Sequence, residues 1–180
     1  MIMKNYLFKS ARLGFRNWLS SDLEALAAIN ADKEVMKFFP STRNLQETWV
    51  FIERMQKQFD KKGYCYFAVD ILETNELIGF IGLSEQNYDA DFTPCIDIGW
   101  RLAKAAWNNG YATEGARRCL EFGFETLQLD KIYSIAPVVN TKSQQVMKKI
   151  GMRQVKTFDH PQLLDNDRLR KCLLYELKKM

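Results

Sequence analysis

The chain has a single histidine, and its four cysteines include no Cys-x-x-Cys pair. Metal sites of recognisable type need closely spaced cysteine and histidine ligands, so no metal is expected. The cysteines Cys65, Cys95, Cys119 and Cys172 are far apart, and three of them lie in apolar segments. Buried free thiols in a reducing compartment are therefore expected, which favours a cytoplasmic location.

The sequence also lacks an apolar run of membrane-spanning length, a signal-peptide pattern, low-complexity segments and internal repeats. A membrane partner is therefore not expected. The 26 Lys and Arg residues exceed the 22 Asp and Glu residues by only four, and they are spread along the chain. Nucleic-acid-binding domains usually gather their basic residues on one face, so no nucleic-acid partner is expected. With 180 residues and no Pro/Gly-rich linker, residues 1–180 are expected to form one domain.

The first third of the chain is predicted to contain one strand and two helices. Residues 12–18 alternate like a strand, with Arg16 pointing outward. A Ser-Ser-Asp cap at 20–22 precedes a helix that continues to Asn30. A second helix is predicted over about 45–62, where a glycine ends it.

Strand-like segments then follow one another with short polar connections, which is typical of an antiparallel meander. Helical and strand-like periods alternate after the meander. The predicted segments are strands at 64–72, 77–86 and 94–102, a helix at about 112–127, a strand at 131–138, a helix at 140–150, and strands at 152–158 and 171–177. This order predicts an α+β fold with a mixed, mostly antiparallel central sheet flanked by helices.

The junction between the strand at 94–102 and the helix at 112–127 is the most informative motif. It reads Trp107-Asn108-Asn109-Gly110-Tyr111-Ala112-Thr113-Glu114. Backbone amides at such a helix start point into one hollow beside the positive end of the helix dipole, where a phosphate or pyrophosphate binds. Gly110 permits a tight backbone conformation there. A single glycine is a weak signal alone, and an ordinary strand–helix connection is the alternative.

This motif resembles the pyrophosphate loop of the GNAT N-acetyltransferases, in the branch related to the ribosomal-protein Nα-acetyltransferases RimJ and RimL. The family pattern is Gln/Arg-x-x-Gly-x-Gly/Ala; Gly110 and Ala112 match it, whereas Trp107 replaces the usual Gln or Arg. A second segment, with Asn140 and Ser143, resembles the family's Asn-x-x-Ser…Lys-x-Gly-Phe pattern, with a methionine for the phenylalanine. Both ends of the chain also resemble this branch.

The resemblance implies the GNAT fold and the transfer of an acetyl group from acetyl-CoA to a primary amine by direct attack on the thioester. The amine belongs either to a small molecule or to a protein N-terminus, and a homodimer is left open. Strands four and five splay apart in the family; here the fourth is 95–102, with amides near Gly99 to Arg101 expected to polarise the thioester carbonyl. The implied cofactor-binding residues are Leu102, Asn108, Asn109, Gly110, Ala112, Thr113 and Asn140.

Three side chains are candidates for the proton transfers. Asp97 lies in an otherwise apolar strand, where burial raises the pKa of a carboxyl and suits it to act as a base. His160 is the other candidate base, because imidazole titrates near neutral pH. The resemblance implies Ser143 as a donor to the leaving thiolate. The alternatives are a solvated face or salt bridge for Asp97, a structural histidine, simple helix caps at Asn140 and Ser143, and attack assisted only by water.

The sequence leaves one other class of function open. A non-catalytic acyl-CoA-binding sensor or partner module would keep the cofactor loop without turnover. A dinucleotide-binding fold needs a Gly-rich turn after the first strand of a βαβ unit. Here the turn follows a meander, so that class is excluded.

Overall fold

The computed structural model describes residues 5–179, and its centre is one eight-stranded sheet. The strand order is β1-β2-β3-β4-β5-β6-β8-β7, and every neighbouring pair is antiparallel except β5 with β6. The strands are β1 (Phe8–Lys9), β2 (Leu13–Arg16), β3 (Tyr66–Ile71), β4 (Leu77–Gln86), β5 (Cys95–Leu102), β6 (Lys131–Pro137), β7 (Arg153–Asp159) and β8 (Lys171–Lys178). The predicted mixed, mostly antiparallel sheet is confirmed.

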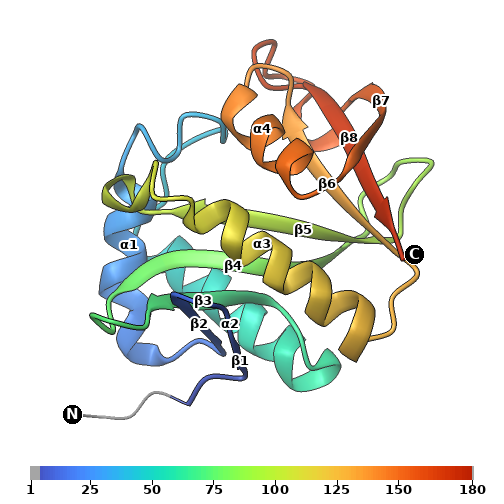
Figure 1. Cartoon of the computed structure of the whole chain (residues 1–180). Coiled ribbons are helices and arrows are strands. Elements are labelled where there is room, and N and C mark those ends of the chain that lie inside the picture. Colours follow the sequence, from blue (N-terminus) through green and yellow to red (C-terminus); the bar gives the residue numbers. More distant parts are fainter. Residues whose placement is uncertain (1–4, 180) are drawn as a thin grey trace.

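Helices cover both faces of this sheet. They are α1 (Leu23–Ala31), α2 (Leu45–Lys62), α3 (Tyr111–Glu121) and α4 (Thr141–Lys149), and α3 continues as a π-helical turn over Phe122–Thr126. In Figure 1, α3 lies in front of the sheet and α1 and α2 lie behind it. Gly115 lets α3 approach β4 closely, because a Cβ there would lie 2.3 Å from Ile81 Cδ1. Among residues 5–179, no helix is both long and apolar enough to cross a bilayer.

Helix α2 begins and ends where its sequence predicts. The Asn44 side chain accepts a hydrogen bond from Glu47 N at 2.9 Å, and the Glu47 carboxylate accepts one from Asn44 N at 2.8 Å. Gly63 follows the last turn in a left-handed conformation, with φ of 77°. These two caps satisfy backbone groups at both ends of α2, and all of the capping residues are neighbours of the helix in the sequence.

The predicted outward orientation of Arg16 is wrong. Its side chain is only 3% exposed and makes ion pairs with Asp22 and Asp70, each at 2.7 Å. Asp22 also accepts a hydrogen bond from Leu19 N, and it makes no side-chain cap for α1. Every residue of β2 is buried, so alternation does not separate core from solvent there.

One further difference from the predicted elements is small. Strand β1 could not be predicted, because a two-residue strand carries no period. All four cysteines are free thiols; Cys65, Cys119 and Cys172 are buried, and Cys95 is half-buried.

Candidate active site

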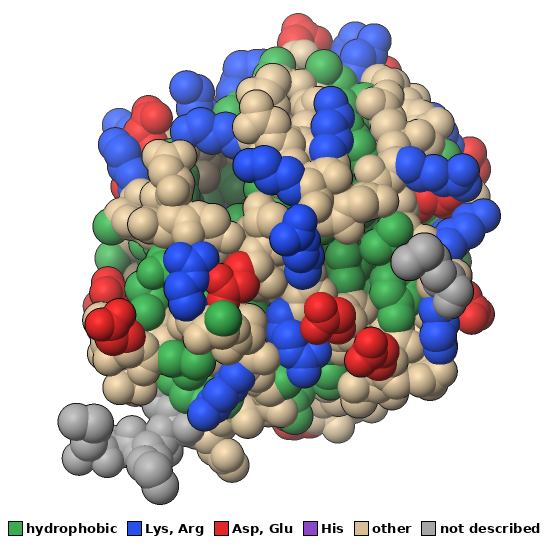
Figure 2. All heavy atoms as spheres, in the orientation of Figure 1, with side chains coloured by type: hydrophobic (Ala, Val, Ile, Leu, Met, Phe, Trp, Pro, Cys, Tyr) green, Lys and Arg blue, Asp and Glu red, His purple; other side chains and the backbone are tan. Residues whose placement is uncertain are grey.

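The parallel strands β5 and β6 are joined at only one end. Their one paired position is Asp97 with Tyr133, and Ser134 Oγ donates a hydrogen bond to the carbonyl of Ile98 at 2.9 Å. Beyond this point β5 follows β4 and β6 follows β8, so the two strands diverge (Figure 1). Figure 2 shows a hollow in the surface at this opening, with Lys and Arg side chains around it.

The alternation of β5 decides which of its backbone groups face the opening. Ala103 N donates to the carbonyl of Ile78 at 2.8 Å, so residues of odd number in β5 direct their backbone groups toward β4. Trp100 and Leu102 therefore direct their amides toward the opening. Amides near residues 99–101 are expected to polarise the thioester carbonyl. Among these three residues, Trp100 is the one whose amide faces the opening.

The turn before α3 carries a row of unpaired amides. Within the described part of the chain, the backbone amides of residues 108–113 donate no hydrogen bond. Asn108 and Gly110 have positive φ angles of 62° and 80°, and such left-handed residues help successive amides to converge into an anion-binding nest. The turn lies at the N-terminus of α3, whose dipole adds positive potential. Five of the seven predicted cofactor-binding residues lie here, and the Trp107 indole donates to the carbonyl of a sixth, Leu102, at 2.9 Å.

Contacts from the first strands hold this turn in place. Glu114 Oε1 accepts hydrogen bonds from Ser10 Oγ at 2.7 Å and from Arg12 N at 2.8 Å. Arg12 Nη2 donates to the carbonyl of Asn109 at 3.0 Å, and its guanidinium lies 4.5 Å from the centre of the Tyr111 ring. Burial acts to raise the pKa of Glu114, but the hydrogen bonds from Ser10 and Arg12 outweigh it and lower that pKa. The turn is therefore fixed by the chain itself.

Helix α4 begins near the same turn. Asn140 Oδ1 accepts a hydrogen bond from Ser143 N at 3.2 Å, so Asn140 caps α4, as the alternative interpretation predicts. Lys142 Nζ lies 4.9 Å from the centre of the Trp107 ring, which links the start of α4 to the turn before α3. The structure thus brings Asn140 and Ser143 to the neighbourhood of the unpaired amides.

Asp97 is buried on the face of the sheet that α2 covers. Its cross-strand neighbour Ser84 donates a hydrogen bond to Gln58 of α2 at 2.9 Å. Asp97 Oδ1 accepts from Tyr66 Oη at 2.6 Å and from Gln86 Nε2 at 3.0 Å. Burial raises the pKa of Asp97 to about 6, although these hydrogen bonds act to lower it. Asp97 is 8% exposed and makes no ion pair within residues 5–179, so it has neither of the two alternative roles.

His160 lies in the connection between β7 and β8. Its Nδ1 accepts a hydrogen bond from Gln162 N at 3.2 Å, and its ring centre lies 4.4 Å from that of Tyr88 and 5.9 Å from that of Phe158. Burial lowers the pKa of His160. Burial also raises the pKa of Tyr88, and the charge of Asp97 adds to this effect. The two candidate bases therefore share Tyr88 as a neighbour.

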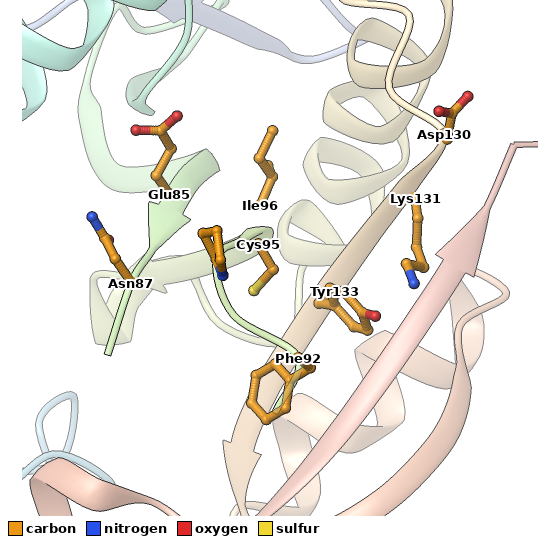
Figure 3. Close-up of a pocket in the computed structure, with 9 residues that line it drawn as sticks. Glu85, Asn87, Phe92, Cys95, Ile96, Asp130, Lys131 and Tyr133 are labelled. Atoms are coloured by element: carbon orange, nitrogen blue, oxygen red, sulfur yellow. The ribbon is translucent and has the colours of Figure 1, made fainter. Parts of the chain in front are cut away.

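Two pockets lie next to this site. The first, of about 500 Å³, lies where β5 and β6 begin, which is the joined end of the two strands (Figure 3). Cys95, Lys131 and Tyr133 line it, and none of the predicted site residues does. The second, of about 360 Å³, lies between α2 and β4 and reaches Tyr66 and Gln86, the two donors to Asp97. Its basic side chains are Arg54, Lys57, Lys61 and Lys62.

Arg101 is a buried cation whose side chain the sequence analysis did not single out. The side chain is 8% exposed, and Nη1 donates a hydrogen bond to Asn30 Oδ1 of α1 at 2.7 Å. The guanidinium lies 4.1 Å from the ring centre of Phe39 and 5.2 Å from that of Phe80. Burial lowers the pKa of Arg101 to about 9, and the charge of Arg43 adds to this effect. In the sequence, Arg101 stands out only as an arginine within an apolar strand. That position does not show whether the guanidinium has a carboxylate to pair with.

Diverging parallel strands beside a nest of unpaired amides are features of a protein that binds a phosphorylated ligand. The model of the acetyltransferase (GNAT) domain matches residues 12–153. The chain therefore belongs to the GNAT acetyltransferase family and is an N-acetyltransferase, as predicted. Enzymes of this family use acetyl-CoA.

Similar proteins agree with this assignment. The uncharacterized N-acetyltransferase YnaD of Bacillus subtilis is 33% identical over 147 residues, which cover 79% of this chain and 80% of YnaD. A GNAT-family acetyltransferase from Bacillus anthracis superposes with a TM-score of 0.78 at 27% identity, covering 94% of this chain and 96% of that one. The ribosomal L7/L12 α-N-protein acetyltransferase RimL, solved with coenzyme A, superposes with a TM-score of 0.75 at 16% identity, covering 94% and 95%. At that identity RimL shares the fold alone.

Proposed function

We propose that this N-acetyltransferase holds the diphosphate of acetyl-CoA on the amides of residues 108–113 and acetylates a primary amine. The row of unpaired amides at the start of α3 carries this proposal, because a diphosphate needs several converging donors. Leu102 and Asn140 border the opening through which the pantetheine arm passes. Trp107 in the loop supports a place in the RimJ/RimL-related branch.

The side chains and amides around the opening supply the chemistry that amide formation needs. Acetyl-CoA supplies an acetyl group that is activated as a thioester. The Trp100 amide donates a hydrogen bond to the carbonyl oxygen, where negative charge grows, and a well-aimed donor of this kind contributes a few kcal/mol. Asp97 accepts the proton that the amine loses as the N–C bond forms. The Ser143 hydroxyl donates a hydrogen bond to sulfur as the C–S bond breaks, so that CoA leaves as a stabilised thiolate.

We assign the role of general base to Asp97 ahead of His160. Asp97 lies on β5, the strand that carries the Trp100 amide, whereas His160 lies in the connection between β7 and β8 and its ring is held between aromatic neighbours. With a pKa of about 6, Asp97 is ionised and can accept a proton at pH 7.5. Activity therefore falls as the pH drops through about 6. A histidine base with a lowered pKa would give a similar fall in activity at acidic pH. Variants of Asp97 and His160, rather than the pH profile, must therefore separate the two candidate bases.

Of the two acceptor types, we propose the small amine. Asp97 and Arg101 lie on the same face of β5, and each is only 8% exposed. Groups that are this little exposed can be reached by a small molecule, whereas the end of a protein chain needs an open groove.

Thiol release from acetyl-CoA, assayed over a panel of small amines and a panel of peptides with free N-termini, tests this proposal. We expect release with small amines, a loss of more than 100-fold in Asp97→Asn, and most of the activity kept in His160→Gln. CoA binding without turnover over both panels would identify a binding module instead. A protein that binds no CoA would contradict the proposal altogether.

A further inference from the structure

Three arginines of this chain bind carboxylates through the same edge of the guanidinium. Arg12 and Arg153 use Nε and Nη2 to contact Glu114 and Glu176. Arg16 donates from Nε and Nη2 to Asp70 at 2.7 and 3.0 Å. This edge carries two parallel N–H groups that match the two oxygens of a carboxylate, so it is the natural place for a carboxylate to bind.

In Arg101 this edge has no acceptor. Nε is buried without a hydrogen-bond partner, and Nη2 donates no hydrogen bond within residues 5–179. Nη1 is held by Asn30 Oδ1, and Asn30 Nδ2 in turn donates to Thr48 Oγ1 at 3.0 Å. The rings of Phe39 and Phe80 pack against the guanidinium. The vacant edge is therefore fixed in orientation before any ligand arrives.

A vacant edge of this kind is costly for the fold. Leaving a buried donor unpaired costs free energy, and burying a cation without a counter-ion costs more. Cation–π contacts with Phe39 and Phe80 offset only part of this cost. Buried charges are normally paired or bound to a ligand. The structure thus contains a preformed site for an anion that the described chain does not supply.

We propose that the Nε/Nη2 edge of Arg101 binds a carboxylate of the acceptor, so that the acceptor is a small amine that also carries a carboxylate. This inference rests on the proposed function, since it names the class of amine. Arg101 directly follows Trp100, whose amide faces the opening. An amine and a carboxylate of one small molecule can therefore reach the thioester and Arg101 together.

The neighbouring charges favour the same class of acceptor. The pocket between α2 and β4 carries four basic side chains and one acidic one, Glu85, which pairs with Lys62 at 3.0 Å, so three cations are left in excess. The pocket reaches Tyr66, and Phe80 contacts both the Tyr66 ring and Arg101. The charge of Arg43 also acts on Arg101. This positive potential attracts an acceptor with an anionic group and repels one with several cationic groups.

Matched acceptor pairs test the proposal. Each pair is an amino acid and the amine that remains when its carboxylate is removed, compared by kcat/KM. We expect the wild-type enzyme to prefer the carboxylate-bearing member by roughly 10–100-fold, the range for a hydrogen bond to a charged group. Arg101→Met should abolish this preference by raising KM for the amino acid while leaving the simple amine unchanged. Arg101→Lys should keep part of it, because the charge remains and the fork is lost.

A binding measurement separates this proposal from the transfer reaction. With CoA present, the amino acid should raise the melting temperature of the wild type and of Arg153→Met, a control that loses an arginine elsewhere, but not that of Arg101→Met. A shift without acetylation of any amine would support the anion site and overturn the proposed transfer. Acetylation with an unchanged preference in Arg101→Met, or without any preference in the wild type, would overturn the anion site alone.

Discussion

Two buried guanidinium groups of the same sheet have opposite surroundings. Arg16 makes four hydrogen bonds to the carboxylates of Asp22 and Asp70. Burial alone would lower the pKa of Arg16, but these hydrogen bonds outweigh it and raise that pKa. Arg101 makes one hydrogen bond, to a neutral amide, and burial lowers its pKa to about 9. The first arginine is paired with carboxylates, whereas the second has no carboxylate partner within residues 5–179.

The two longest helices show the same contrast at their N-termini. Asn44 and Glu47 cap α2 reciprocally, so its first amides are satisfied. Helix α3 starts at Gly110 without any side-chain cap, although its dipole and its amides call for one. The first amides of α2 are thus satisfied by the chain, whereas those of the turn before α3, beside the opening between β5 and β6, are left unpaired.

Replacing the two arginines by methionine should give the largest difference. Arg16→Met leaves two buried carboxylates without a counter-ion, so we expect a loss of about 3–5 kcal/mol in the free energy of unfolding. Arg101→Met removes a cation that has no counter-ion, so its change should stay within about 1 kcal/mol or be stabilising. Urea unfolding of both variants measures this difference. Equal losses in the free energy of unfolding would contradict the proposed difference between Arg16 and Arg101.

Asp97→Asn should separate activity from stability. Asn keeps an oxygen to accept from Tyr66 and Gln86 but cannot take a proton, so kcat should fall about 10²–10⁴-fold. The pKa of Asp97 is raised to about 6, so its contribution to stability is present below the unfolded pKa near 3.9 and is lost as the pH rises through about 6. Above pH 6 the variant should therefore be more stable than the wild type, by at most about 3 kcal/mol. Unfolding at pH 4 and pH 8 checks the sign, and a variant less stable at pH 8 would contradict it.

Gly110→Ala and Gly63→Ala form a matched pair. Both glycines have left-handed φ angles, 80° and 77°, so each substitution should cost about 1–2 kcal/mol of stability. Only Gly110 lies in the nest, so only Gly110→Ala should weaken CoA binding, by about tenfold, which corresponds to 1.4 kcal/mol. Calorimetric titration with CoA measures both variants. Equal affinities of the two variants for CoA would contradict the proposal that the nest binds the cofactor.

His160→Gln should have the smallest effect. The ring packs against Tyr88 and Phe158 and Nδ1 accepts from Gln162 N, which are structural contacts. We expect kcat to stay within about threefold of the wild type, far less than the 10²–10⁴-fold of a lost general base. Steady-state kinetics at pH 7.5 measures it. A loss as large as that of Asp97→Asn would instead favour His160 as the base.

The parts of this molecule that could be predicted from its sequence are those with local causes. The caps at Asn44 and Asn140 and the long periodic strands and helices depend on residues a few positions apart. The orientation of Arg16 could not be predicted, because its partner Asp70 is 54 residues away. The vacant edge of Arg101 could not be predicted either, since a missing partner leaves no pattern. For Asp97 the sequence left burial, a solvated face and a salt bridge open, and it could not predict the hydrogen bonds from Tyr66 and Gln86.

Titration calorimetry with CoA and with pantetheine, which lacks the diphosphate, tests the central claim most directly. The unpaired amides of residues 108–113 should bind the diphosphate, so CoA should bind at least 100-fold more tightly than pantetheine, a difference of about 2.7 kcal/mol. Equal affinities, or no heat with CoA, would contradict the account.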